Sequence, residues 1–206
     1  MSEHRPPEID KLYYQLTELG ADPIHHDFSI ARDNQRELIH EGHRYLITPR
    51  DDAQVEYDQV MQAAGIHGVD IVNGFFESSG CVIAEIPRDT RTLEQVAVST
   101  GSEKTTAASV YGEFGRMIGD IALKAGKLPL ASTINLHSVA YARIEDRVIL
   151  APQLGFVDSS DESKLELERA VATQLDPKYK KFGADEMIKA FKEGLNNQNG
   201  NTFTSA

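Results

Sequence analysis

Two short groups of side chains in this sequence carry atoms that bind metal ions. His25, His26 and Asp27 are consecutive, and residues 158–162 form an acidic run that contains two serines. Adjacent residues of a strand point to opposite faces, so surface polar residues are the favoured interpretation of the histidine pair. The acidic run lacks the spaced oxygen ligands and the glycine of a calcium loop, and it lies where a helix should begin. We therefore expect it to cap that helix, and we expect no metal site.

His137 carries the side chain that most readily exchanges a proton near neutral pH. It follows Leu136 in a segment without acidic residues, where it could act as a general base or contact a ligand. A hydrogen-bonded structural histidine is the favoured interpretation. The single cysteine, Cys81, excludes an intrachain disulfide, and its apolar surroundings favour a buried small side chain over a reactive thiol. No nucleophile elbow, phosphate-binding loop or dinucleotide fingerprint occurs.

The composition limits the classes of function. The chain has 206 residues, 40% of them hydrophobic, which is enough for one or two small domains with a packed core. Its net charge of −11 argues against general nucleic-acid binding, which needs a basic face, and against docking on an anionic membrane surface. The polar N-terminus lacks a signal-peptide core, and no apolar run approaches the roughly 20 residues that span a bilayer. We therefore expect a soluble, cytoplasmic protein without nucleic-acid or membrane partners.

The first part of the chain is predicted to be mainly extended. Apolar residues at helical spacing predict helices over 9–19 and 53–64. Turn-like pairs separate three extended segments between residues 27 and 49. Two apolar runs, at 69–76 and 80–86, read as an antiparallel pair that Pro87 ends.

Helices are predicted to dominate the second part. The strongest covers 104–125, where the apolar side chains form one face. After an irregular segment at 127–136, two short strands form a hairpin that turns at Glu145 and Asp146. The remaining predicted helices are a short one at 92–98, one at 161–174 with Ser160 or Asp161 as its N-cap, and one at 184–195.

This order of elements predicts an α+β protein with two lobes and a boundary near residues 86–90. The N-terminal lobe has a mainly antiparallel sheet, and the C-terminal lobe is helical with one inserted hairpin. The expected segments are a disordered N-terminus at 1–8, the β-rich lobe at 9–87, the helical lobe at 88–195 and a disordered tail at 196–206.

Within this order, the stretch 45–94 resembles the small lobe of the protein-kinase-like superfamily. Within that superfamily, the chain resembles the compact bacterial branches, namely lipopolysaccharide kinases, aminoglycoside phosphotransferases and small RIO-type kinases. The resemblance covers about residues 27–195. It implies that Glu56 is the helix glutamate that pairs with a strand lysine to hold nucleotide phosphates. It also implies that residues 85–87, which begin with Glu85, are the hinge that meets the adenine. The helix 104–125 looks like the long helix that precedes the catalytic loop.

The sequence departs from that family where the chemistry is concentrated. Thr48 stands at the expected place of the lysine, and Arg50 is the nearest cation. No glycine-rich loop precedes it, which removes a cradle of backbone N–H groups for phosphates. In the expected catalytic loop, Ser132 and His137 stand where the family has an Asp and an Asn. The segment 151–155 carries no carboxylate at the place of the metal-binding Asp.

The resemblance thus implies a degenerate kinase-like domain, or pseudokinase, that acts as a binding or regulatory module for a protein partner or a small ligand. The candidate cleft residues are Arg50, Glu56, Glu85 and His137. The alternative is an atypical ATP-dependent phosphotransferase acting on a small molecule or a protein. Only that alternative calls for ATP and magnesium, and Asp158 or Asp161 would then supply displaced carboxylates. An unrelated α+β protein is the third possibility.

Overall fold

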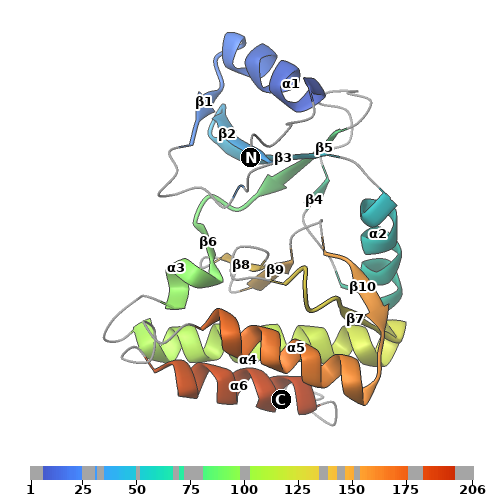
Figure 1. The fold of residues 1–206 in the computed structure, drawn as a ribbon. Coiled ribbons are helices and arrows are strands. Elements are labelled where there is room, and N and C mark those ends of the chain that lie inside the picture. Colours follow the sequence, from blue (N-terminus) through green and yellow to red (C-terminus); the bar gives the residue numbers. More distant parts are fainter. Residues whose placement is uncertain are drawn as a thin grey trace, which may run out of the picture.

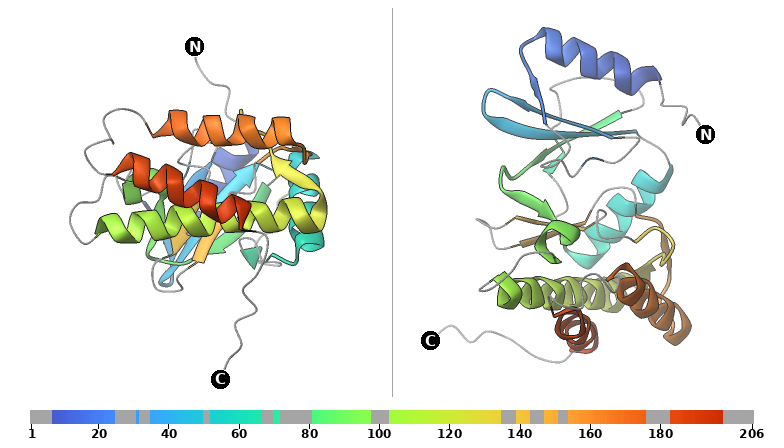
Figure 2. Two further views of the ribbon diagram at one scale, coloured as in Figure 1. Left: turned by 90° about the horizontal axis from the view of Figure 1, so that it is seen from below. Right: turned by 60° about the vertical axis from the view of Figure 1, so that its left-hand side comes forward.

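The elements of the molecule stack in layers, as Figures 1 and 2 show. At one end a helix covers a sheet, a smaller sheet follows, and a layer of helices closes the other end. The computed structural model describes residues 7–24, 31, 35–49, 52–66, 70–71, 81–97, 103–134, 139–142, 147–150, 154–175 and 183–197.

The first layer is the helix α1 (Pro7–Glu18), which lies on a five-stranded antiparallel sheet. The sheet has the order β1-β2-β3-β5-β4, with β1 (Asp22–Pro23), β2 (Arg36–His40), β3 (His43–Pro49), β4 (Asp70–Ile71) and β5 (Cys81–Ile86). Glu41 and Gly42 join β2 to β3 as a two-residue turn, and both have positive φ angles, 48° and 88°. Such a turn matches the twist of the two strands and sets their register.

Alternation along the strands gives this sheet two different faces. One face is covered by α1, because Leu12 and Leu16 of the helix pack against Leu38, Tyr45 and Ile47. The residues in between, such as Leu46, point to the opposite face, toward the rest of the molecule.

The middle layer contains two small antiparallel sheets. One has the order β6-β8-β9, with β6 (Thr90–Thr92), β8 (Val139–Ala142) and β9 (Arg147–Leu150). The other pairs β7 (Lys127–Pro129) with β10 (Phe156–Asp158). The short helix α3 (Leu93–Ala97) follows β6 directly.

The last layer contains α4 (Glu103–Ala125), α5 (Asp161–Gln174) and α6 (Ala184–Asn196), which Figure 2 shows side by side from below. The rings of Phe114 and Phe191, with centroids 5.1 Å apart, join α4 to α6. The helix α2 (Asp52–Ala64) belongs to this part of the core, because Tyr57, Val60 and Met61 are buried in the same cluster. Among the helices that the structure describes, none is long and apolar enough to cross a membrane.

The α+β architecture predicted from the sequence is confirmed, with an antiparallel N-terminal sheet and a helical C-terminal part. One boundary needs correction. Pro7 and Glu8 were expected in a disordered segment, but they form the first residues of α1, because proline suits the first helical position. Residues 1–6 and 198–206 lie outside the described part of the chain, as does the turn at Glu145 and Asp146.

The short strands were not predicted. The segment 127–136 was expected to be irregular, but its first residues form β7, and β1, β6 and β10 were also missed. Each has only two or three residues, too few to show an alternating pattern. The predicted strand over 69–76 is described only at Asp70 and Ile71, where it pairs antiparallel with β5 as expected.

Candidate functional site at the junction of the two sheets

The inner face of the N-terminal sheet meets the β6-β8-β9 sheet. Leu46 and Ile86 of the N-terminal sheet pack against Ala140, Ala142 and Ile149 of the β6-β8-β9 sheet. We call this contact, together with the polar residues beside it, the junction. Those polar residues are Gln35, Glu37, Arg44 and Thr48 on the side of the N-terminal sheet, and Thr90 and Thr92 in β6.

The junction concentrates the buried polarity of the molecule. Within the described ranges, its six polar residues are all of the polar or charged residues that are buried, at 1% to 5% exposure. Folding normally leaves such groups in water unless they are hydrogen-bonded or paired. Their gathering between two sheets marks this contact as something other than an ordinary apolar core.

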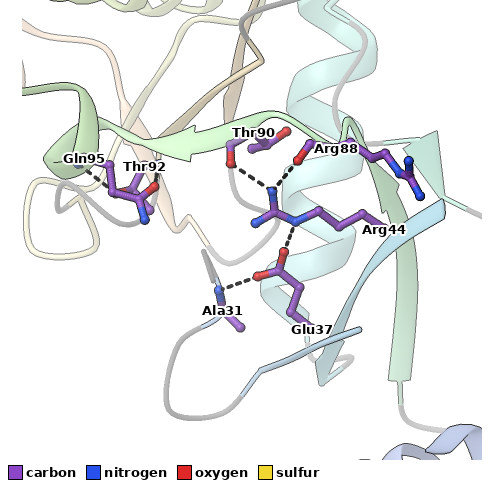
Figure 3. A network of polar contacts seen from close by, with 7 residues as sticks. All are labelled: Ala31, Glu37, Arg44, Arg88, Thr90, Thr92 and Gln95. Atoms are coloured by element: carbon purple, nitrogen blue, oxygen red, sulfur yellow. Dashed lines mark hydrogen bonds and ion pairs between the residues drawn. The ribbon is translucent and has the colours of Figure 1, made fainter. Parts of the chain in front are cut away.

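A buried ion pair is the centre of the polar part, and Figure 3 shows it from close by. The Arg44 guanidinium donates through Nε to the carboxylate of Glu37 on the neighbouring strand. Its Nη1 donates to the backbone carbonyl oxygens of Arg88 and Thr90, at 2.9 Å each. The second oxygen of Glu37 accepts from the backbone N–H of Ala31 at 3.3 Å. One side chain thus holds β2, β3 and the segment that leads into β6.

The apolar part of the junction is filled by the chain's own side chains. Leu46, Ile86, Ala140, Ala142 and Ile149 are 0% to 5% exposed. A cleft open to solvent would leave some of this surface accessible. The two sheets are therefore closed on each other at this cluster.

Glu85 lies on the other side of the sheet from the junction. It is opposite Tyr45, whose ring packs toward α1, and its Oε1 is 2.6 Å from Nδ1 of His43. Burial raises the pKa of Tyr45, and the negative charges of Glu85 and Glu41 raise it further. The structure does not bring the Glu85 carboxylate to the inner face, although Ile86, the next residue, does point there.

Glu56 belongs to a charged group between α2, β7 and β10. Nζ of Lys127 lies 2.8 Å from Oδ1 of Asp158, and Glu56 is close enough to act on Lys127 electrostatically. The hydrogen bond and charge of Asp158 raise the pKa of Lys127, and Glu56 adds to this effect. The adjacent Tyr57 anchors α2, because its hydroxyl donates to the carbonyl oxygen of Leu150 at 2.9 Å.

The remaining predicted site residues divide into those that the structure describes and those that it does not. Thr48, at the place expected for a lysine, is buried, and its hydroxyl accepts from Nε2 of Gln35 at 3.0 Å. Arg50 and His137 lie outside the described residues, as does the pair His25 and His26.

The acidic run at 158–162 caps α5, as the sequence predicted. The hydroxyl of Ser160 accepts from the backbone N–H of Ser163, and the Ser163 hydroxyl bonds back to the Ser160 backbone N–H, which forms a capping box. Over the described ranges, no group of three or more ligating side chains is placed to hold a metal ion.

The Lys127 pair gives a prediction for acidic pH. The hydrogen bond and positive charge of Lys127 lower the pKa of the Asp158 carboxyl below its usual value. A lowered folded-state pKa stabilises the fold above the ordinary pKa, and that stabilisation is lost as pH falls through the folded value. In NMR titrations of the Asp158 carboxyl carbon, Lys127→Met should return the pKa to its ordinary value, whereas Lys124→Met should leave it unchanged. An unchanged pKa in Lys127→Met would contradict the pairing.

The Glu37–Arg44 pair was missed by sequence analysis, although a signal for it exists. In the predicted hairpin, Glu37 lies opposite Leu46, and Arg44 has the same alternation as Leu46. Charged residues that share the alternation of the inward apolar residues of a strand indicate a buried ion pair.

Comparison with known proteins gives distant likenesses. The chain matches no protein-family model and no curated protein. Among solved structures, it is similar to WaaP in complex with acyl carrier protein, at 13% identity over 92% of this chain and 88% of that chain, with a TM-score of 0.49. It is also similar to the choline kinase LicA from Streptococcus pneumoniae, at 9% identity over 94% and 81% of the two chains, with a TM-score of 0.43. At these values, neither likeness assigns an activity, a substrate or a partner to this chain.

Proposed function

We propose that this chain is a two-lobed, kinase-like domain that acts as a binding or regulatory module without transferring phosphate. The order β3, α2, β4, β5 supports the kinase-like part, since it is the order on which the sequence resemblance rests. The helix α4 and the hairpin of β8 and β9 follow in the expected sequence. The partner is a protein or a small ligand that binds outside the junction.

The single observation that carries the proposal is the filled junction. In the kinase-like arrangement, the segment 85–87 meets the adenine, so the space beside it must admit a flat ring. Here Ile86 packs on Leu46, Ala140, Ala142 and Ile149, all of them buried. A nucleotide would have to separate these side chains before it could bind.

The backbone beside that segment is also engaged. The carbonyl oxygens of Arg88 and Thr90 accept hydrogen bonds from Arg44, and a ligand at the same place would have to compete with a charged donor. Thr48 supplies a hydroxyl in place of a lysine, and it is engaged with Gln35. The lysine that would stabilise a transferring phosphoryl group is thus replaced by a hydroxyl that bonds within the N-terminal sheet.

One observation favours the competing proposal of an atypical phosphotransferase. Lys127 forms an ion pair with Asp158, and the charge of Glu56 also acts on Lys127, so two carboxylates and a cation lie in the same region. Such a group could serve phosphoryl transfer with its carboxylates displaced from their usual positions. The Asp158 side chain is 90% exposed, however, which favours a surface ion pair.

A thermal-shift experiment with ATP separates the two proposals. A ligand that binds only the folded state raises the midpoint, by about 2.7 kcal/mol of added stability at 100 times its Kd. We expect no shift at millimolar ATP, with or without magnesium. A magnesium-dependent rise that Glu56→Gln abolishes, and that the exposed control Glu166→Gln retains, would contradict the filled junction on which the proposal depends and would favour the phosphotransferase alternative.

A further inference from the structure

The apolar core of the described chain is divided into three clusters, and the junction is the smallest of them. The largest joins α2, α4, α5 and α6 to the side of the β8–β9 hairpin that faces away from the junction. A second lies between α1 and the outer face of the N-terminal sheet. The elements around the largest cluster form a helical body, and the N-terminal sheet with α1 forms a second body. Only five buried residues form the third cluster, which lies between these two bodies. Each body therefore has its own core, and the contact between them contributes less apolar burial than either.

We propose that Arg44, oriented by its ion pair with Glu37, is a clasp that keeps the two bodies closed, and that release of its bond to Thr90 lets the N-terminal sheet move with α1 as one unit. Interfaces between bodies with separate cores are where rigid-body movements occur. The clasp lies at this interface, because Arg44 and Glu37 belong to the sheet, whereas Thr90 begins the β6-β8-β9 sheet.

The chemistry of the contact supports a positioning role over a purely stabilising one. A buried ion pair loses much of its attraction to desolvation, so well-packed apolar residues would hold the sheets together at least as well. What the guanidinium adds is direction, because it meets a carboxylate and two carbonyl oxygens in one plane of donors. The bond to the Thr90 carbonyl crosses between the two bodies, so it forms in one relative placement and is lost when they separate, whereas the bond to Glu37 stays within the sheet and fixes the direction of the guanidinium.

A second observation points to incomplete closure. The Thr90 hydroxyl oxygen is buried and has no hydrogen-bond partner among the residues that the structure describes, although the Thr90 carbonyl accepts from Arg44. A buried polar group without a partner costs free energy that solvent would return. Opening the junction hydrates this hydroxyl, which lowers the free energy of opening. The inference does not rest on the proposed function, because it follows from the contacts whether or not a nucleotide binds.

Thiol labelling under native conditions tests the clasp. In a Cys81→Ala background, Thr90→Cys introduces a thiol of similar size at the junction. Ala107→Cys introduces one in the large cluster, where the residue is 1% exposed. The first thiol reports opening of the junction, and the second reports unfolding of the helical body. In Arg44→Met we expect labelling at position 90 to accelerate at least about tenfold, since charge-assisted hydrogen bonds are lost, while labelling at position 107 accelerates much less.

The matched control is Arg36→Met on the same sheet. Arg36 also forms an ion pair, with Asp10 at 2.9 Å, but on the outer face, so labelling at position 90 should stay unchanged. Arg44→Lys keeps the charge and loses the planar fork of donors, and we expect an intermediate rate at position 90. Equal acceleration at both positions in Arg44→Met and Arg44→Lys would show a purely structural pair and overturn the proposal. Unchanged labelling in both variants would overturn it as well.

Discussion

Replacing Gly115 by alanine should destabilise the protein by about 3 kcal/mol, although alanine favours a helix over glycine. Gly115 lies where α4 crosses α6, and the backbone of the two helices meets there. A methyl group at Gly115 would overlap the carbonyl oxygen of Phe191 and lie 2.9 Å from the amide nitrogen of Leu195. The obstacle is backbone on both sides, so the helices would have to separate and lose the packing of Phe191.

The control for this prediction is Gly112→Ala, the same change one turn earlier in the same helix. A methyl group there meets its nearest neighbour, the carbonyl oxygen of Ala190, at 3.6 Å, which is an ordinary contact. This variant should be neutral or more stable by up to about 1 kcal/mol, because alanine loses less entropy when a helix forms. Urea unfolding of both variants measures the difference. Equal stabilities would show that α4 and α6 do not approach as closely as the structure places them.

The sequence predicted the long elements because their signals are local. The apolar face of α4 repeats over 23 residues, and the turn at Glu41 and Gly42 lies between two alternating strands. The capping of α5 at Ser160 was also predictable, because a serine followed by acidic residues suits a helix N-terminus. In each case the cause lies within a few residues of the effect.

Features that depend on distant contacts could not be predicted in this way. The helix α2 was assigned to the N-terminal lobe, but Tyr57, Val60 and Met61 pack in the cluster of the helical part. The apolar face of α2 predicts that the helix packs against other elements, but it does not identify them. The same limit applies to Glu56, because its neighbour Lys127 is 71 positions away, and only the fold brings the two together.

The junction combines both kinds of feature. Alternation predicts that Leu46 and Arg44 share a face of β3, but it does not say whether that face borders a cleft or another sheet. Two α+β proteins with the same strands can therefore differ in whether a ligand fits between their layers. The distinction depends on Ala140, Ala142 and Ile149, which reach the junction from a hairpin about 100 residues further along the chain.

Leu46→Ala is therefore the variant that most directly tests whether the junction is closed. Leu46 is 2% exposed and lies among apolar side chains of both sheets. Removing three carbons from a packed site costs the transfer free energy and leaves a cavity, together about 2 to 5 kcal/mol. In an open cleft the same side chain would be partly hydrated already, and the loss would be much smaller.

The control is Leu165→Ala on α5, where the leucine is 47% exposed and the stability should change by less than about 0.5 kcal/mol. Urea unfolding with a common slope gives both values. A loss below about 1 kcal/mol in Leu46→Ala would mean that the two sheets do not pack on each other, since truncation of a packed leucine lowers the free energy of unfolding by more than this. The proposed function would then lose the observation that carries it, because a hydrated gap beside Ile86 could admit a nucleotide. A loss in the full range would instead require any ligand between the sheets to displace packed side chains at a similar free-energy cost.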